Sequence, residues 1–184
     1  MCGIIFRAKV RNQIDVGWNE LDELAIEQQN WWLFGTPIPR DFVSNSHLFL
    51  TPNKTGEYVQ ISVLPETIGQ FIGLFDNTKW NEIESIRQDG WLRNYSKEAW
   101  KGIPIFTGDI IKVYLNDAKT AFGVIKYGYY GLTQATEDKT HLGFYIDWID
   151  KSLWYRQDIG FWFREYPIEV IGNRYDNRDL LTKK

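Results

Sequence analysis

The sequence predicts a mainly β fold of the β-rich α+β type, arranged as a small barrel or roll with helical insertions. Aromatic residues make up 16% of the chain, and 15 Gly separate short runs of β-prone residues. Loops typical of hairpins join several of these runs. At 184 residues, we expect one domain or two small lobes that share a core.

The first half of the chain alternates β-prone runs with turn residues. Residues 19–29 differ, because Asn19 can cap a helix on which Leu21 and Leu24 share one face. Residues 52–56 are typical of a hairpin loop. We therefore expect strands at residues 4–10, 31–35, 47–51, 57–63 and 68–74.

The second half begins with a segment of different character. In residues 77–101, Asn77 or Thr78 can cap a helix with an apolar face, so we expect a helical insert. Residues 147–155 fit a short helix or an edge strand equally well, and the tail from Asn177 is expected to fray. Strands are expected at residues 108–115, 121–127, 142–147, 160–165 and 168–173, the first two joined by a loop at 116–120.

Composition limits the setting and the partners. The net charge of −3 and pI near 5.5 argue against a broad basic face for duplex nucleic acid. The single Cys, Cys2, excludes an intrachain disulfide and fits a reducing cytoplasm. The sequence contains no apolar run of membrane-spanning length and no signal peptide, so we expect a cytoplasmic protein without a membrane partner.

Three segments with internal glycines, residues 65–76, 105–113 and 169–177, are the most informative part of the sequence. Each places Gly between β-prone residues, where a strand turns, bulges or is crossed closely by backbone. Asp and Asn beside such a glycine can bond turn amides or adopt left-handed geometry. We interpret six positions as structural: Gly69, Gly73, Gly108, Asp109, Gly172 and Asn173.

These segments, together with Phe6-Arg7-Ala8-Lys9, resemble the YopX family of phage and prophage proteins. Order and residue type agree at all four places, which are residues 6–9, 65–74, 105–112 and 170–177 with Leu180-Leu181 following. The resemblance implies an SH3-like barrel core, often oligomeric, with no established enzymatic activity. No catalytic residue can be carried over, because the family's motifs describe architecture.

The chain departs from the family pattern at three places, the first being residues 12–30, which look longer than the usual early hairpin. The helical insert lengthens the connection between the first and second glycine segments, and Arg178 stands where a Pro is usual. We therefore divide one YopX-like domain, residues 1–184, into three parts. These are an N-terminal β lobe at about 1–75, a helical insert at about 77–101 and a C-terminal β-barrel lobe at about 103–176.

Signals for enzymatic chemistry are weak. Met1-Cys2-Gly3-Ile4 is similar to the start of class II glutamine amidotransferases, whose exposed Cys is a nucleophile. The other motifs of those enzymes are missing, so we favour an ordinary residue before a strand. With two His and one Cys, a zinc site is not expected, and solvated turns explain the acids at 147–150 and 176–179. We expect no metal and no cofactor.

Two groups of aromatic residues are candidates for binding. On a sheet, aromatic rings can stack bases while Arg meets phosphate. A core with a subunit interface is the alternative that we favour for this group, which is Tyr127, Tyr129, Tyr130, Arg156, Trp162 and Arg164. In the helical insert, Trp91 or Trp100 could contact a partner.

Three functional hypotheses follow. The leading one is a non-enzymatic phage or prophage accessory protein that forms a homo-oligomer and binds a protein or a small ligand. Its protein partner would come from the host or the phage. The alternative is a binder of nucleotides or single-stranded nucleic acid with a counter-defence role. The third is a hydrolase that depends on Cys2.

Overall fold

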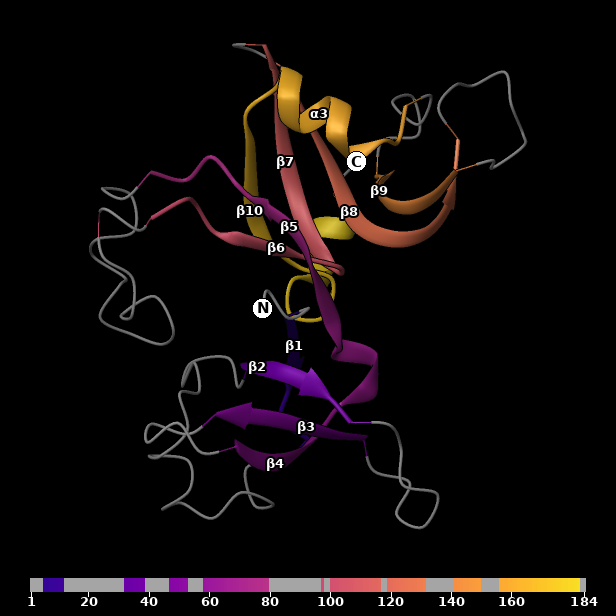
Figure 1. The fold of residues 1–184 in the computed structure, drawn as a ribbon. Coiled ribbons are helices and arrows are strands. Elements are labelled where there is room, and N and C mark those ends of the chain that lie inside the picture. Colours follow the sequence, from indigo (N-terminus) through magenta and orange to yellow (C-terminus); the bar gives the residue numbers. More distant parts are fainter. Residues whose placement is uncertain are drawn as a thin grey trace. The chain divides into compact units, whose positions relative to one another are not determined.

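The computed structural model describes residues 5–11, 32–38, 47–52, 58–79, 97, 100–116, 119–131, 141–149 and 156–182. Within this part of the chain the fold is mainly β, as the sequence predicts, and consists of two antiparallel sheets and one α-helix (Figure 1). The chain divides into two compact units. The first comprises residues 1–71 and 79–100, and the second residues 72–78 and 101–184.

The first unit is built on successive antiparallel strands. A 3-10 helix, η2 (Pro65–Thr67), connects β4 (residues 58–63) to β5 (residues 69–75). β5 continues into the second unit. The order in this sheet is β4-β3-β2-β1-β5-β6. Its strands are β1 (Phe6–Lys9), β2 (Trp32–Pro37), β3 (His47–Pro52), β4 (Tyr58–Val63), β5 (Gly69–Phe75) and β6 (Pro104–Phe106). Of these, β6 and the end of β5 belong to the second unit.

The end of β1 closes the strands of the first unit into a ring. Val10 forms an antiparallel bridge with Val63, and the N–H of Leu64 donates to the carbonyl of Lys9 over 2.9 Å. This pairing covers an edge of β4 that would otherwise be open. The enclosed core consists of the buried side chains of Ala8, Val10, Leu33, Phe49, Ile61 and Val63.

The second unit contains a four-stranded sheet in the order β10-β7-β8-β9. β7 (Asp109–Asn116) and β8 (Lys119–Tyr130) form the predicted hairpin, whose loop begins with the N–H of Lys119 donating to Asn116 Oδ1 over 2.8 Å. β9 (His141–Trp148) pairs with β8 and β10 (Ile168–Asn173) with β7. The core includes Ile105, Ile111, Val113, Ala121, Ile125, Ile146, Trp148, Trp162 and Ile168.

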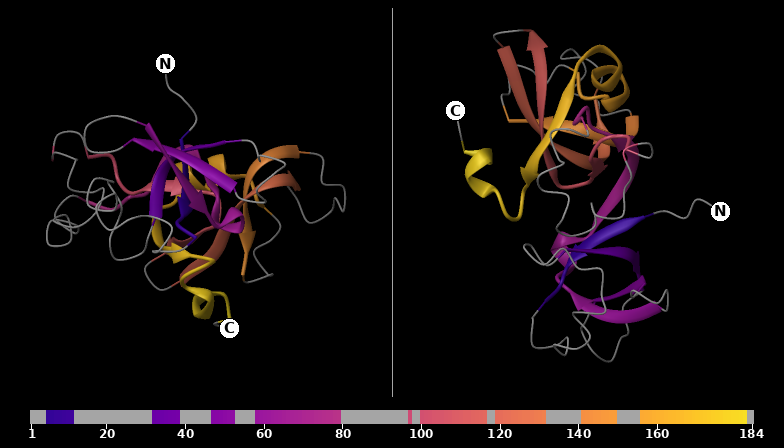
Figure 2. Two further views of the ribbon diagram at one scale, coloured as in Figure 1. Left: turned by 90° about the horizontal axis from the view of Figure 1, so that it is seen from below. Right: turned by 90° about the vertical axis from the view of Figure 1, so that its left-hand side faces the viewer.

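The predicted strand at residues 160–165 is wrong, because Ile159–Glu165 forms a helix, α3. Asp158 caps it, accepting from the N–H of Phe161 over 3.2 Å. The aromatic run favours a strand by propensity, but the cap and the burial of Trp162 in the core decide for a helix. In Figure 2, β10 follows α3 and leads to the C-terminal 3-10 turn η6 (Arg178–Leu181). The tail from Asn177 was expected to fray, but this part of it forms a turn.

Strands β1 to β5 and β7 to β10 agree with the predicted runs within three residues at each end. The largest difference is at β8, predicted at 121–127, which continues to Tyr130. β6 was not predicted, since three residues carry no periodicity. The predicted helix at 19–29, nearly all of the predicted insert at 77–101, residues 150–155 and Cys2 lie outside the described residues.

Candidate functional site

The second glycine segment forms a tight turn between β6 and β7. Gly108 has a φ of 92°, in the left-handed region that favours glycine. The carboxylate of Asp109 is fully buried and accepts from the N–H of Phe106 over 2.8 Å. The N–H of Gly108 donates to the carbonyl of Ile125 on β8 over 2.8 Å. These hydrogen bonds therefore fix the turn between β6 and β7 and connect it to β8.

The third glycine segment has a similar role at the end of β10. Gly172 has a φ of 154°, and a Cβ built there would lie 2.4 Å from Oδ1 of Asn177. That oxygen accepts from the N–H of Asn173 over 3.1 Å, while Asn173 Oδ1 accepts from the N–H groups of Tyr175 and Asp176. In the first segment, Gly69 pairs with Arg7, and Gly73 has a φ of 83°.

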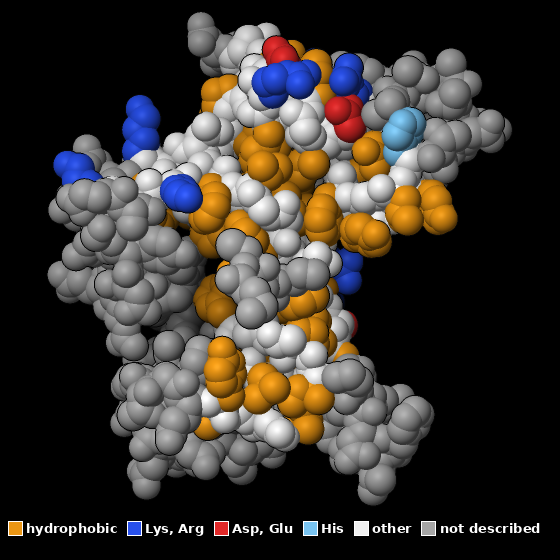
Figure 3. All heavy atoms as spheres, viewed as in Figure 1, with side chains coloured by type: hydrophobic (Ala, Val, Ile, Leu, Met, Phe, Trp, Pro, Cys, Tyr) orange, Lys and Arg blue, Asp and Glu red, His pale blue; other side chains and the backbone are white. Residues whose placement is uncertain are grey.

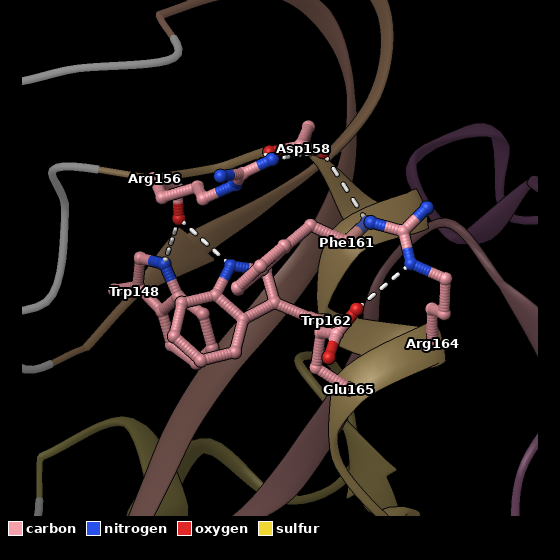
Figure 4. A network of polar contacts seen from close by, with 7 residues as sticks. All are labelled: Trp148, Arg156, Asp158, Phe161, Trp162, Arg164 and Glu165. Atoms are coloured by element: carbon pink, nitrogen blue, oxygen red, sulfur yellow. Dashed lines mark hydrogen bonds and ion pairs between the residues drawn. The ribbon is translucent and has the colours of Figure 1, made fainter.

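The candidate residues around α3 form a network of intramolecular contacts (Figure 4). The carbonyl of Arg156 accepts from the indole N–H of Trp148 over 2.8 Å and of Trp162 over 2.9 Å. Trp162 is 2% exposed, so it belongs to the core. The aromatic ring of Phe161 lies 3.7 Å from the Arg156 guanidinium, which also pairs with Asp158 over 2.7 Å.

Arg164 lies in the last turn of α3. Its side chain is 70% exposed and its Nε is 2.8 Å from the carboxylate of Glu165. Arg156 and Arg164 thus each meet a neighbouring carboxylate. The three tyrosines of the candidate group lie on a different element, β8, so the structure separates the six residues into two sets.

The tyrosines of β8 extend the face of the strand that lines the core. Ala121 and Ile125 point into the core, and alternation puts Tyr127 and Tyr129 on the same face. Tyr127 lies opposite Phe144 of β9, with ring centroids 5.2 Å apart, and Tyr129 lies opposite Leu142. We call the four side chains Tyr127, Tyr129, Leu142 and Phe144 the aromatic face.

The aromatic face lies largely in solvent. Tyr127 is 59% exposed, Tyr129 60% and Leu142 56%. Hydrophobic side chains gather over this end of β8 and β9 in Figure 3. All four members of the face are uncharged, and three of them are among the most exposed large hydrophobic residues of the part described. Chemically, the face can stack rings and bury apolar area.

The opposite side of the same two strands is filled by its own rings. Tyr130 stacks on Tyr145 with centroids 5.8 Å apart and 19° between the planes, and it also meets His141 at 5.6 Å. Lys126 pairs with Asp147 over 2.6 Å on this side. Tyr130 is therefore half-buried against its neighbours and does not belong to the aromatic face.

Leu142 and Phe144 were absent from the sequence-based candidates. The alternation of residues 142–147 marked a strand, but only the register with β8 brings these two side chains beside the tyrosines. Trp100, a candidate partner contact, is half-buried, and Trp91 lies outside the described residues.

The described residues contain no group of three or more His, Cys, Asp or Glu that could hold a metal ion. Nor do they include a helix with the length and apolar character needed to cross a membrane.

No family model matches the chain, and searches of curated proteins and of solved structures found no match either. Membership of the YopX family stays a prediction from the glycine segments.

Proposed function

We propose that the protein is a non-enzymatic binding protein that associates with a second copy of itself through the aromatic face. One observation carries this proposal. The core-lining side of β8 and β9 continues beyond the core as Tyr127, Tyr129 and Leu142, each more than half exposed. Contiguous apolar side chains in water are characteristic of protein contact sites, where Tyr is enriched.

Charge favours a second copy as the occupant. A two-fold interface brings each patch against itself, so a charged patch would repel its own copy. The aromatic face carries no charge and avoids this cost. A partner rich in phosphate would need cations directed at it, whereas Lys126 and Arg156 each contact a carboxylate of the same chain, Asp147 and Asp158.

The size of the face predicts the strength of association. A fully exposed aromatic side chain offers roughly 150–250 Å², so the three most exposed members leave roughly 300 Å² in water. A stable interface buries about 800 Å² on each partner. The face alone is smaller than this, so we expect a weak association whose extent rises with protein concentration.

Sedimentation equilibrium over a wide concentration range tests the proposal. The wild type is expected to associate, and the double substitution Tyr129→Ser and Leu142→Ser to weaken association at least tenfold. Tyr58→Ser on β4 is the matched control, since Tyr58 is 71% exposed but lies in the first unit. A wild type that stays monomeric at all concentrations, or equal association in the double variant, would contradict the proposal.

We also propose a phage or prophage origin, a cytoplasmic setting and an SH3-like barrel. We propose the barrel for the first unit, whereas from the sequence we expect the barrel lobe at about 103–176. The glycine segments support the origin. The order β1-β2-β3-β4, a 3-10 helix and then β5 returning to β1 supports the barrel type. Replication, lysogeny or counter-defence genes beside this gene would support the origin, and a location among unrelated housekeeping genes would oppose it.

One observation favours a second candidate function, the binding of nucleotides or single-stranded nucleic acid. Tyr127 and Tyr129 present exposed rings on one strand, and such rings can stack bases without sequence preference. Calorimetry against cyclic nucleotides and short oligonucleotides tests it. Heat of binding that disappears in Tyr129→Ser would support this function, and a silent panel would exclude it.

A further inference from the structure

The two strands that carry the aromatic face contain a pair of glycines opposite one another. Gly128 of β8 pairs with Gly143 of β9, and Gly128 has a φ of 155°, which side chains other than glycine rarely adopt. One ring from each strand, Tyr130 of β8 and Tyr145 of β9, covers the pair on the same side of the ribbon. A Cβ at Gly143 would lie 3.8 Å from the ring of Tyr130, and one at Gly128 would lie 3.7 Å from the ring of Tyr145.

The two rings meet across the glycine pair, on one side of the ribbon. Tyr130 lies opposite His141, which is four residues from Tyr145 along β9. On a straight strand that separation is about 13 Å, at about 3.3 Å per residue. The ring centroids are only 5.8 Å apart. Both rings therefore lean over the glycines toward each other, as side chains do on the inner side of a bend.

Two hydrogen bonds to Gln157, near the start of α3, show that the ribbon is curved. The carbonyl of Gln157 accepts from the N–H of Ile146 over 3.0 Å, and its side-chain Oε1 accepts from the N–H of Gly131 over 3.3 Å. Ile146 pairs with Ile125, which is six residues before Gly131, or about 20 Å along a straight strand. A glutamine side chain cannot span that distance, so β8 bends back, as Figure 1 shows.

We infer that Gly128, Tyr130 and Tyr145 are positioning residues for the aromatic face. They stabilise the bend and lie on its inner side. Tyr127, Tyr129 and Leu142 lie on the other side of the strands, which is the outer side of the bend. Only glycine adopts the backbone geometry of residue 128 without strain, and the stacked rings fill the inner side of the bend. This inference rests on the proposed function, since it concerns the presentation of the same face.

Two substitutions test the inference, and each has a matched control variant. Tyr145→Ala removes the stacked ring and Gly128→Ala strains the backbone, so each is expected to weaken self-association about tenfold. Tyr145→Phe keeps the ring, and Gly143→Ala adds a methyl group at an ordinary contact distance of 3.8 Å. Both are expected to stay within about twofold of the wild type, which is small on the scale of binding free energies.

The readouts separate positioning from general stability. Sedimentation equilibrium gives the association constant, while near-ultraviolet circular dichroism and thermal unfolding report on the core around Trp148 and Trp162. Weaker association with an unchanged core signal supports the inference. Loss of the core signal in both Tyr145→Ala and Gly128→Ala would overturn it, because these residues would then maintain the core itself.

Tyr129→Ser, measured in parallel, keeps the two proposals distinguishable. If Tyr129→Ser weakens association and neither Tyr145→Ala nor Gly128→Ala does, the positioning inference is wrong and the proposed function stands. If Tyr129→Ser itself has no effect on association, the proposed function is wrong.

Discussion

The backbone N–H of Arg174 donates to the carbonyl oxygen of Gly108 over 2.9 Å. This bond joins the second glycine segment to the third, and the N–H of Gly108 joins β8 through Ile125. A Cβ at residue 108 would lie 3.2 Å from the ring of Tyr175. The second and third glycine segments therefore connect strands of the sheet to one another. The candidate binding residues lie elsewhere in the chain.

The first prediction concerns Gly172. Gly172→Ala is expected to destabilise the protein by about 3 kcal/mol, because the new methyl group would displace the Asn177 side chain and strain the backbone. Urea unfolding measures the effect. Gly160→Ala in α3 is the control, since no atom lies within 4 Å of its Cβ position. It is expected to stabilise by about 0.5–1 kcal/mol. Equal effects of the two substitutions would show that the turn geometry is unimportant.

The second prediction concerns Asp76, a buried carboxylate that connects three segments of the second unit. It accepts from the N–H of Ile103 over 2.7 Å and of Val170 over 3.0 Å, and from both the N–H and the hydroxyl of Thr78. Asp76→Ala would leave two distant amides without an acceptor, at a cost of about 3 kcal/mol in the free energy of unfolding. The exposed Glu66→Ala should cost less than about 0.5 kcal/mol. Similar losses in both variants would contradict this role.

The third prediction concerns the segment between β5 and β6. Asp76 and Ile103 exchange backbone and side-chain bonds, so the chain leaves and re-enters the second unit at one place. Replacing residues 80–99 with a short Gly-Ser linker should leave the amides of β7 protected in hydrogen exchange, because closing a short loop costs little. Loss of that protection would show that the second unit depends on the segment.

The fourth prediction separates the α3 network from the aromatic face. Trp162→Phe removes one of the two donors to the Arg156 carbonyl and leaves a cavity, so we expect a loss of about 2 kcal/mol in unfolding free energy. Self-association at temperatures where the variant is folded should be unchanged. A variant that unfolds normally but no longer associates would place Trp162 at the interface instead.

Most of the strands could be predicted from the sequence, and the candidate site only in part. Alternation and hairpin loops located β3, β4, β7 and β8 because these signals are local. α3 was missed since its β-prone run Phe161-Trp162-Phe163 outweighs a single capping residue, Asp158. Tyr127 and Tyr129 were identified from the local run of aromatic residues at 127–131. Leu142 could be identified only from the pairing of β9 with β8. The burial of Trp162 could be recognised only from its packing against Trp148. Both are tertiary contacts, which the sequence pattern does not reveal.

The most direct test of the central claim is photocrosslinking of the purified protein with p-benzoylphenylalanine in place of Tyr129. The account predicts a crosslinked homodimer from position 129, and none from the same probe at Tyr58, which is 71% exposed in the first unit. A homodimer from position 58 alone, or no homodimer from position 129 at concentrations where the protein associates, would contradict it.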